Sequence, residues 1–230
     1  MNNMTDYNTW HQHHSLEDDI TASWHIFVRY SLQRQDVDQK ELLEIGCGRG
    51  GFSHYLANLQ YPPKKLHACD YSTSALEIGQ KKYSRDNIFW KQENIMALSF
   101  PQASFDTAIS CETIEHVPDP KKAIQELSRV LKPGGRLLLT CPNYFNLFGI
   151  WCLYRWLIGK PYTEGGQPYV NYILMPRVYF WLKKSGFKIE KFVSSEIIIP
   201  ARVPKHFYSK STPWWLRIFG HRTFYVLYKT

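Results

Sequence analysis

The five cysteines of this 230-residue chain include no CxxC pair, and their number is odd. A disulfide framework and a thiolate zinc site are therefore both disfavoured, and a reducing, cytoplasmic setting is expected. The first ten residues are polar and lack the apolar core of a secretory leader. The longest apolar run, residues 144–158, contains Arg155 and is shorter than the about 20 residues of a membrane-spanning helix. This run predicts either a buried helix or a helix that lies at an interface.

Acidic residues are scarce in the last part of the chain. Residues 143–230 contain 13 basic and 3 acidic residues, whereas residues 1–142 contain 15 basic and 17 acidic residues. The same last part holds 22 of the 36 aromatic residues. The formal net charge of +8 is therefore concentrated in a basic, aromatic C-terminal third, which follows a near-neutral body.

Strand and helix signals alternate through the near-neutral body. After a first helix at 16–35, the apolar pattern predicts strands at 41–45, 65–69, 87–91, 105–110 and 136–140, with helices at 51–59, from 72 onward, and at 119–131. Units of this kind with short links predict a doubly wound α/β fold with a parallel sheet. Ligands bind such sheets at the carboxyl ends of the strands.

The rhythm changes after Cys141. The pattern predicts an aromatic helix at 145–158, a polar loop at 159–170, a helix near 175–185, and strands at 187–192 and 223–228. No repeat or low-complexity linker separates this part from the rest. We therefore predict a single domain over residues 1–230, with an N-terminal helical cover (1–40), a core (41–142), and a lid with C-terminal strands (143–230).

A glycine-rich turn follows the first predicted strand. Glycines there let the backbone turn tightly and approach a ligand closely. Gly46, Gly48 and Gly51 fit the GxGxxG spacing of dinucleotide-binding proteins, and Asp70 follows at the distance of a ribose-binding acid. Taken alone, this turn leaves a NAD-binding oxidoreductase and a purely structural turn as alternatives.

Five features in order favour another reading of that turn. They are Glu44 two residues before the first glycine, Asp70 ending the second strand, Asn94 after the third, Phe105-Asp106 opening the fourth, and Leu131-Lys132-Pro133-Gly134-Gly135 before the fifth. Over residues 41–142 this set resembles the class I S-adenosylmethionine-dependent methyltransferases. The resemblance implies a Rossmann-like sheet of seven strands, mostly parallel with the last one antiparallel, helices on both faces, and an aromatic lid after the fifth strand.

The resemblance also implies S-adenosylmethionine as cofactor and S-adenosylhomocysteine as product. A carboxylate at Glu44 suits a cationic ligand and would repel a pyrophosphate, and Asp70 offers two acceptor oxygens to ribose hydroxyls. Asn94 stands where the family more often has aspartate, and it keeps one acceptor oxygen for adenine. The predicted cofactor residues are Tyr7, Trp10, Glu44, Gly46, Cys47, Gly48, Gly50, Asp70, Tyr71, Asn94, Ile95 and Cys111.

The loop after the fourth strand carries the candidate catalytic residues, Glu115 and His116. The Glu-His pair followed by Val-Pro-Asp-Pro resembles O-methyltransferases of the ubiquinone-biosynthesis type. His116 is the predicted base, since an unperturbed imidazole titrates near neutral pH. A structural role for His116 is the alternative, because proximity alone accelerates methyl transfer.

No metal site is expected in the chain. No carboxylate set marks a divalent-metal site, and the N-terminal histidines His11, His13 and His14 are expected to form a solvated segment rather than a metal site. Cys111 is expected to contact the cofactor through its backbone and not to act as a nucleophile.

The basic, aromatic third bears on the methyl acceptor. A small hydrophobic or lipid-linked acceptor, methylated on oxygen, is favoured, with a soluble sugar or other small metabolite as the alternative. Nucleic acid is disfavoured because the aromatics lie in apolar runs. Residues 211–220 mix tryptophans with a basic residue, which suits peripheral contact with an anionic membrane at its inner surface, and a non-catalytic membrane-surface binding module stays open. No feature indicates an obligate protein partner.

Overall fold

The computed structural model describes residues 3–13, 20–195, 197–199, 205–207 and 218–230. The strands are β1 (Glu41–Ile45), β2 (Lys65–Asp70), β3 (Ile88–Gln92), β4 (Phe105–Cys111), β5 (Leu131–Pro142), β6 (Phe187–Ser195), β7 (Ile197–Ile199), β8 (Lys205–Phe207) and β9 (Arg222–Lys229). The helices are α1 (Asn3–His13), α2 (Ser23–Ser31), α3 (Arg34–Val37), α4 (Gly51–Ala57), α5 (Thr73–Lys82), the 3-10 turn η1 (Ile114–His116), α6 (Pro120–Val130), α7 (Leu147–Leu157) and α8 (Met175–Lys184).

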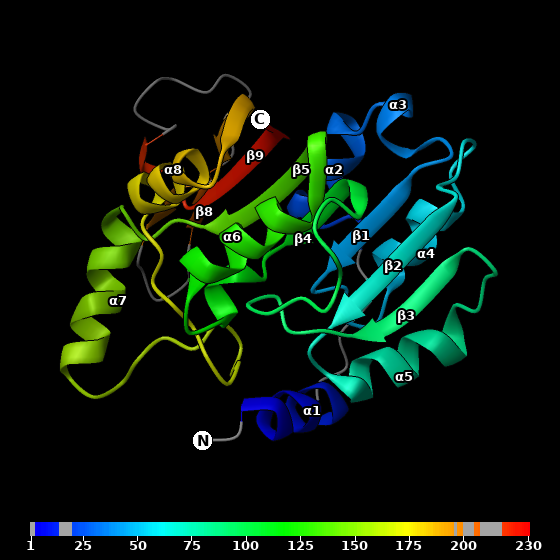
Figure 1. Ribbon diagram of the computed structural model, residues 1–230. Helices are drawn as coiled ribbons and strands as arrows, with labels where there is room; N and C mark the ends of the chain where they lie inside the picture. The colour runs from blue at the N-terminus through cyan, green and yellow to red at the C-terminus, as the bar shows by residue number, and fades with distance from the viewer. Residues whose placement is uncertain (1–2, 14–19, 196, 200–204, 208–217) are drawn as a thin grey trace.

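Seven strands form one sheet in the order β3-β2-β1-β4-β5-β9-β6, which Figure 1 shows with helices in front of it and behind it. The pairs among β1 to β5 are parallel, and β9 runs antiparallel to both β5 and β6. The predicted fold class, a doubly wound Rossmann-like sheet with an antiparallel last strand, is confirmed. A separate hairpin pairs β7 with β8.

Helices cover both faces of the sheet because its strands are apolar on both sides. Successive side chains of a strand point to opposite faces. In β1, Leu43 belongs to a core that includes buried residues of α6 and α8, while its neighbour Leu42 belongs to a core with buried residues of α2 and α4. Continuous apolar strands of this kind are typical of parallel sheets buried between two helical layers. The polar ends of these strands are therefore free to build a site at the rim.

The predicted helix at 119–131 forms as α6, and its first residues explain where it begins. The carboxylate of Asp119 accepts a hydrogen bond from the backbone N–H of Lys122 (3.0 Å), and Pro120 takes the first turn of α6. Ala123 and Leu127 are fully buried on its inner face. The helix holds the loop that precedes it, which carries the catalytic candidates, against the core.

The strand predicted at 136–140 is longer in the structure and contains a bulge. β5 begins at Leu131, which pairs with Phe105, and the pairing resumes only when Arg136 meets Thr107. The Lys-Pro-Gly-Gly sequence between these pairs is the irregular stretch, and Gly134 in it has a left-handed backbone (φ 75°). The glycines that follow the predicted helix thus lie inside a strand, where they form the bulge.

The single helix predicted at 16–35 is wrong, because its described part is divided into α2 and α3. Leu32 has an extended backbone (ψ 129°) between the two helices. The backbone N–H of Gln33 donates to the carboxylate of Asp36 (2.7 Å), which starts α3. Asp36 is buried in an ion pair with Arg136 of β5. A contact with a distant strand therefore ends the first helix.

The lid and the termini complete the fold. α7 confirms the aromatic helix predicted at 145–158. α1 lies within the predicted N-terminal helical cover (1–40), although no helix was predicted at its residues, and the β7-β8 hairpin was not predicted. Residues 211–217 of the tryptophan-rich segment lie outside the described residues. Among the described helices, none combines the length and the apolar character needed to cross a membrane.

Candidate active site

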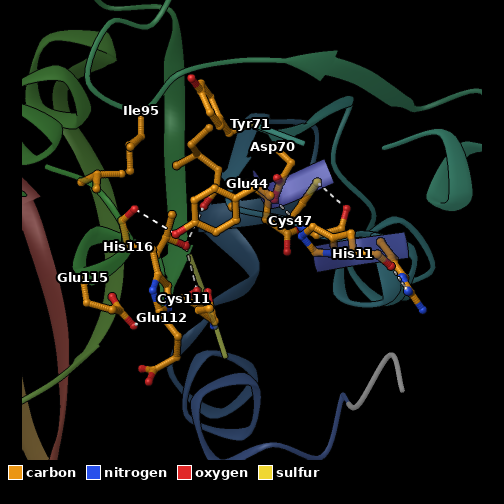
Figure 2. A pocket seen from close by; sticks show the side chains of 18 of the residues that line it. His11, Glu44, Cys47, Asp70, Tyr71, Ile95, Cys111, Glu112, Glu115 and His116 are labelled. Atoms are coloured by element: carbon orange, nitrogen blue, oxygen red, sulfur yellow. Dashed lines mark hydrogen bonds and ion pairs between the residues drawn. The ribbon is translucent and has the colours of Figure 1, made fainter. Parts of the chain in front are cut away.

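A cavity of about 670 Å³ opens at the carboxyl ends of β1, β2 and β4. The predicted cofactor residues that line it are Tyr7, Trp10, Glu44, Gly46, Cys47, Gly48, Asp70, Tyr71, Asn94, Ile95 and Cys111, and both predicted catalytic residues, Glu115 and His116, line it as well. Figure 2 shows Glu115, His116 and Glu112 at one side of the pocket and Asp70, Cys47 and His11 at the other. The fold therefore brings the predicted residues together, and Gly50 alone among them does not line the cavity.

The glycine turn is shaped by close neighbours. Gly46 has φ 80°, and a side chain there would lie 2.1 Å from the Thr113 hydroxyl oxygen. Gly50 has φ 77°, and a side chain there would lie 2.1 Å from the Trp90 ring. Gly50 thus makes room for a tryptophan and caps α4, which explains why it is not in the pocket. Gly48 (φ 54°) lines the cavity, and a side chain there would meet only the His11 ring, at 4.0 Å, so a ligand can come close to its backbone.

Asp70 is held in place by two backbone donors. Its Oδ2 accepts from the N–H of Gly48 (2.8 Å), and its Oδ1 accepts from the N–H of Ser72 (2.9 Å) at the start of α5. Each carboxylate oxygen retains a second lone pair. The carboxylate is therefore oriented for two further donors, which fits the pair of ribose hydroxyls for which the sequence predicted it.

Glu44 lies at the end of β1 beneath the turn and is buried. Burial raises its pKa to about 8, and a hydrogen bond from the Ser53 hydroxyl (2.5 Å) partly opposes this rise. A cationic ligand beside Glu44 would favour the carboxylate. The residue thus fits a sulfonium and an ammonium group, and its charge depends on whether they are bound.

We expect cofactor affinity to depend on pH through Glu44. Because the free carboxyl has a pKa near 8 and the cationic ligand prefers the carboxylate, binding should release a proton below that pH. The affinity for S-adenosylmethionine should therefore rise by up to about tenfold per pH unit as the pH approaches 8, then level off. Calorimetric titration at several pH values measures this rise. In Glu44→Gln the slope should disappear, and an identical slope in that variant would contradict the assignment.

The third strand contributes the predicted adenine contacts. Asn94 and Ile95 follow β3 and line the cavity. The side-chain oxygen of Asn94 accepts from the backbone N–H of Met96 (2.9 Å), which fixes the loop. The oxygen predicted to hold the adenine amine is thus also the oxygen that shapes the loop, and the adenine role of both residues stays a prediction.

Helix α1 lies across the pocket beside the lid. The Tyr7 hydroxyl donates to the backbone carbonyl of His116 (3.1 Å), and the Trp10 indole N–H donates to the carbonyl of Gly165 (3.4 Å). These bonds join the N-terminus to the catalytic loop and to the loop after α7. Both aromatic residues line the cavity, and their cofactor role stays a prediction.

The N-terminal histidines differ from the expectation in one respect. His13 is exposed, as expected, and its ring nitrogen bonds the carbonyl of Thr9 (2.8 Å). His11 is buried and lines the pocket, so the solvated segment predicted for it is wrong. Helix formation in α1 turns His11 toward the glycine turn, where its backbone carbonyl accepts from Arg49 (2.5 Å). His14 lies outside the described residues.

His116 has a defined tautomer. Its Nδ1 lies 2.9 Å from the carbonyl oxygen of Tyr169, and because a carbonyl only accepts, Nδ1 carries the proton. Nε2 therefore presents a lone pair, 3.7 Å from Glu115 Oε1 and 3.8 Å from Glu164 Oε2. Burial lowers the pKa of His116 to about 4, so the imidazole is neutral at pH 7. A neutral imidazole with a free lone pair can accept a proton from a substrate.

Glu164 is the functional candidate that sequence reasoning missed. It comes from the loop after α7, and its Oε1 accepts from the Tyr144 hydroxyl (3.2 Å). Burial, with the charge of Glu112 as the next cause, raises its pKa to about 7. A signal was present, because Glu164 is the only acid in residues 143–189.

Glu115 completes this cluster. It is 1% exposed, and neither of its carboxyl oxygens has a hydrogen-bond partner among the described residues. Burial raises its pKa well above the ordinary value, which favours the protonated carboxyl. Together, Glu115, His116 and Glu164 place three ligand-type atoms within 4.8 Å of one another, the set among the described residues that could hold a cation.

The neighbouring polar groups are already engaged. The Glu112 carboxylate accepts from the Thr140 hydroxyl (2.8 Å) and pairs with Arg222 (3.1 Å). Burial raises the pKa of the Cys111 thiol well above its ordinary value. The thiol is therefore a poor nucleophile, which agrees with the expectation that Cys111 contributes only its backbone.

Comparisons with known proteins identify the kind of domain. Residues 43–139 match the family described as "Methyltransferase domain". The demethylmenaquinone methyltransferase of Lactococcus lactis is 29% identical over 162 residues, which are 66% of this chain and 60% of the relative. The ubiquinone biosynthesis O-methyltransferase of Xanthomonas euvesicatoria is 27% identical over 170 residues, which are 71% of this chain and 69% of the relative. Further relatives are named for a fatty-acid and for a tRNA acceptor.

A solved structure agrees with these relatives. The crystal structure of an S-adenosylmethionine dependent methyltransferase from Mesorhizobium loti matches with a TM-score of 0.67 and 16% identity, and the match covers 92% of this chain and 100% of that chain. The NAD alternative finds no support in these matches, and the buried acid at the glycine turn fits a cation better than a pyrophosphate. Residues 43–139 are therefore a class I S-adenosylmethionine-dependent methyltransferase domain, which confirms the predicted enzyme class and the predicted cofactor.

Proposed function

We propose that the chain transfers a methyl group from S-adenosylmethionine to a hydroxyl oxygen of a small hydrophobic or lipid-linked acceptor. The observation that carries this proposal is the open Nε2 of His116 between Glu115 and Glu164, in the same cavity as the glycine turn and Asp70. A proton acceptor thus lies in the pocket that fits the methyl donor. Acceptors that bind without losing a proton would not need such a cluster.

The residues around His116 have separable tasks in this reaction. When bound, the cofactor supplies a methyl group on a sulfonium, which becomes a neutral thioether once the methyl has left. His116 Nε2 takes the proton of the acceptor hydroxyl as the new carbon–oxygen bond forms. The carbonyl of Tyr169 holds the ring through Nδ1, and an ionised Glu164 stabilises the imidazolium that results.

The remaining lining of the cavity supports an apolar acceptor. Besides the polar groups already described, the wall includes Trp24, Phe52, Met96, Val117 and Pro118. Apolar walls with a few placed polar groups are typical of small-molecule sites. A soluble sugar, the alternative from the sequence, would leave the hydroxyls that face these apolar groups without partners.

We place the reaction in a reducing compartment, which fits the cytoplasm. All five cysteines are free, and four of them are buried. Burial raises the pKa of buried thiols such as Cys141, which keeps them protonated and unreactive. This supports the expected location, and cell fractionation would test it.

The acceptor class can be tested by following the methyl group. The full chain is incubated with S-adenosylmethionine labelled in its methyl group and with a lysate separated into lipid, aqueous and nucleic-acid fractions. We expect label in the lipid fraction, and none with Asp70→Ala. Label in the aqueous fraction alone would favour the sugar or metabolite, and label in nucleic acid would overturn the acceptor class. Absence of label from every fraction would contradict methyl transfer itself.

A further inference from the structure

The outer face of α7 is apolar and exposed. Leu147, Ile150 and Leu157 are 64%, 65% and 68% exposed. We call this face the α7 surface. All its members are about half exposed or more, and they are Leu147, Ile150, Leu153, Trp156, Leu157 and Ile158. Single exposed apolar residues are ordinary, but a contiguous helical face of them marks an interaction site. In Figure 1 this helix stands at the margin of the molecule, apart from the sheet.

The opposite face of α7 fixes the helix to the protein. Phe148 and Cys152, four residues apart, are buried in a small core that also contains Tyr144. The side chain of Asn146 caps the helix by accepting from the N–H of Gly149 (2.9 Å). The α7 surface is therefore presented by an anchored helix.

The charged residues on and just after α7 are basic: Arg155 lies within the helix, and exposed Lys160 follows it. Residues 143–230 contain 13 basic and only 3 acidic residues. Of the two acids that the structure describes there, Glu164 is turned into the pocket, and Glu190 is paired with Arg136 (2.7 Å). Little negative charge is thus left to oppose an anionic partner.

Charge and aromatic content favour a lipid surface as that partner. The exposed residues Tyr154 and Trp156 are of the types that sit at the boundary between lipid headgroups and hydrocarbon. A second copy of the chain would bring two basic regions together, which costs repulsion. Helix α7 has 11 residues and extends about 16 Å, about half of the hydrocarbon thickness, so it can lie along a bilayer but cannot cross it.

The α7 surface is linked to the active site through the chain itself. Tyr144, just before α7, donates to Glu164, just after it, and packs against Phe148 (6.2 Å between ring centres). Phe148 also contacts Tyr162 in the loop after α7 (5.2 Å between ring centres). We infer that the α7 surface docks on an anionic phospholipid bilayer and holds the lid of the pocket at the membrane. This inference concerns a surface outside the pocket and goes beyond the proposed reaction.

Vesicle sedimentation tests this surface with the full chain. We expect binding to vesicles that contain phosphatidylglycerol, and binding at least about tenfold weaker to pure phosphatidylcholine or in high salt. The variant Ile150→Glu/Leu157→Glu should bind the anionic vesicles at least about tenfold less. The matched control is Ile26→Glu/Tyr30→Glu, which places the same charges at two exposed apolar positions of α2. Its binding to the anionic vesicles should fall less than that of the α7 variant.

Separate readouts keep the outcomes distinct. Both double variants should bind S-adenosylhomocysteine as the wild type does, so a failure of membrane docking leaves the proposed reaction untouched. Absence of wild-type binding to anionic vesicles at low salt would overturn the inference. So would equal loss in the two variants, or a wild-type dimer in sedimentation analysis that the α7 variant converts to a monomer.

Discussion

Replacing Asp70 with alanine is expected to weaken S-adenosylhomocysteine binding by at least about a hundredfold. The carboxylate is oriented by the N–H groups of Gly48 and Ser72, and its remaining lone pairs face the cavity. Each hydrogen bond to a charged group contributes about 1.5–3 kcal/mol, so loss of two ribose contacts accounts for this factor. The glycine turn also loses the acceptor that holds Gly48 in place. Calorimetric titration with S-adenosylhomocysteine measures the effect.

Two further variants define what the loss means. Asp70→Asn keeps one acceptor oxygen and should fall between alanine and the wild type. Asp86→Ala removes an exposed acid in the loop before β3 and should leave affinity unchanged. Unfolding transitions recorded for all three would show whether the chain stays folded. Wild-type affinity in a folded Asp70→Ala variant would remove Asp70 from cofactor binding.

The features that the sequence predicted correctly depend on short stretches of chain. The glycine turn, Asp70 at the end of β2, and the starts of α5 and α6 all follow from neighbouring residues. Alternating strand and helix signals then leave few ways to arrange a parallel sheet. Most of the site followed as well, because the carboxyl ends of parallel strands meet at one edge.

The features that could not be predicted from the sequence depend on contacts between distant residues. Tyr7 bonds the carbonyl of His116, which lies 109 residues later, and such a contact turns a polar segment into the helix α1. The break after α2 depends on the ion pair of Asp36 with Arg136. Glu164 lies in an irregular loop, and no local pattern indicates that this loop folds back over the catalytic residues.

The chemistry of His116 also changed once its surroundings were known. An imidazole with an ordinary pKa near neutrality was predicted from the sequence. The structure buries it and lowers its pKa to about 4, while the pKa of Glu164 is raised to about 7. Of these two groups, the glutamate of the lid titrates near neutral pH. The imidazole is unprotonated throughout that range, and the charge of an ionised Glu164 would strengthen it as a base.

This division predicts different effects for the two residues. His116→Asn keeps a donor for the carbonyl of Tyr169 but removes the Nε2 lone pair. Its kcat should fall by about 10²–10⁴, the usual contribution of a general base, while S-adenosylhomocysteine affinity stays within about twofold. Steady-state kinetics with an acceptor that the wild type methylates measure kcat, and calorimetry measures the affinity for S-adenosylhomocysteine. A wild-type kcat would mean that alignment alone drives the reaction and that the histidine only packs beside the cofactor.

Glu164→Gln should change the pH profile rather than abolish the reaction. Below about pH 7 the carboxyl of Glu164 is protonated and cannot stabilise an imidazolium, so wild-type kcat should rise with pH through about 7 and then level off. Glutamine keeps the acceptor for the Tyr144 hydroxyl but does not titrate, so this rise should vanish and kcat should stay near the low-pH value of the wild type. A rise that persists in Glu164→Gln would assign it to another group. Since His116 titrates well below this range, such a result would exclude both His116 and Glu164 as the source of the rise.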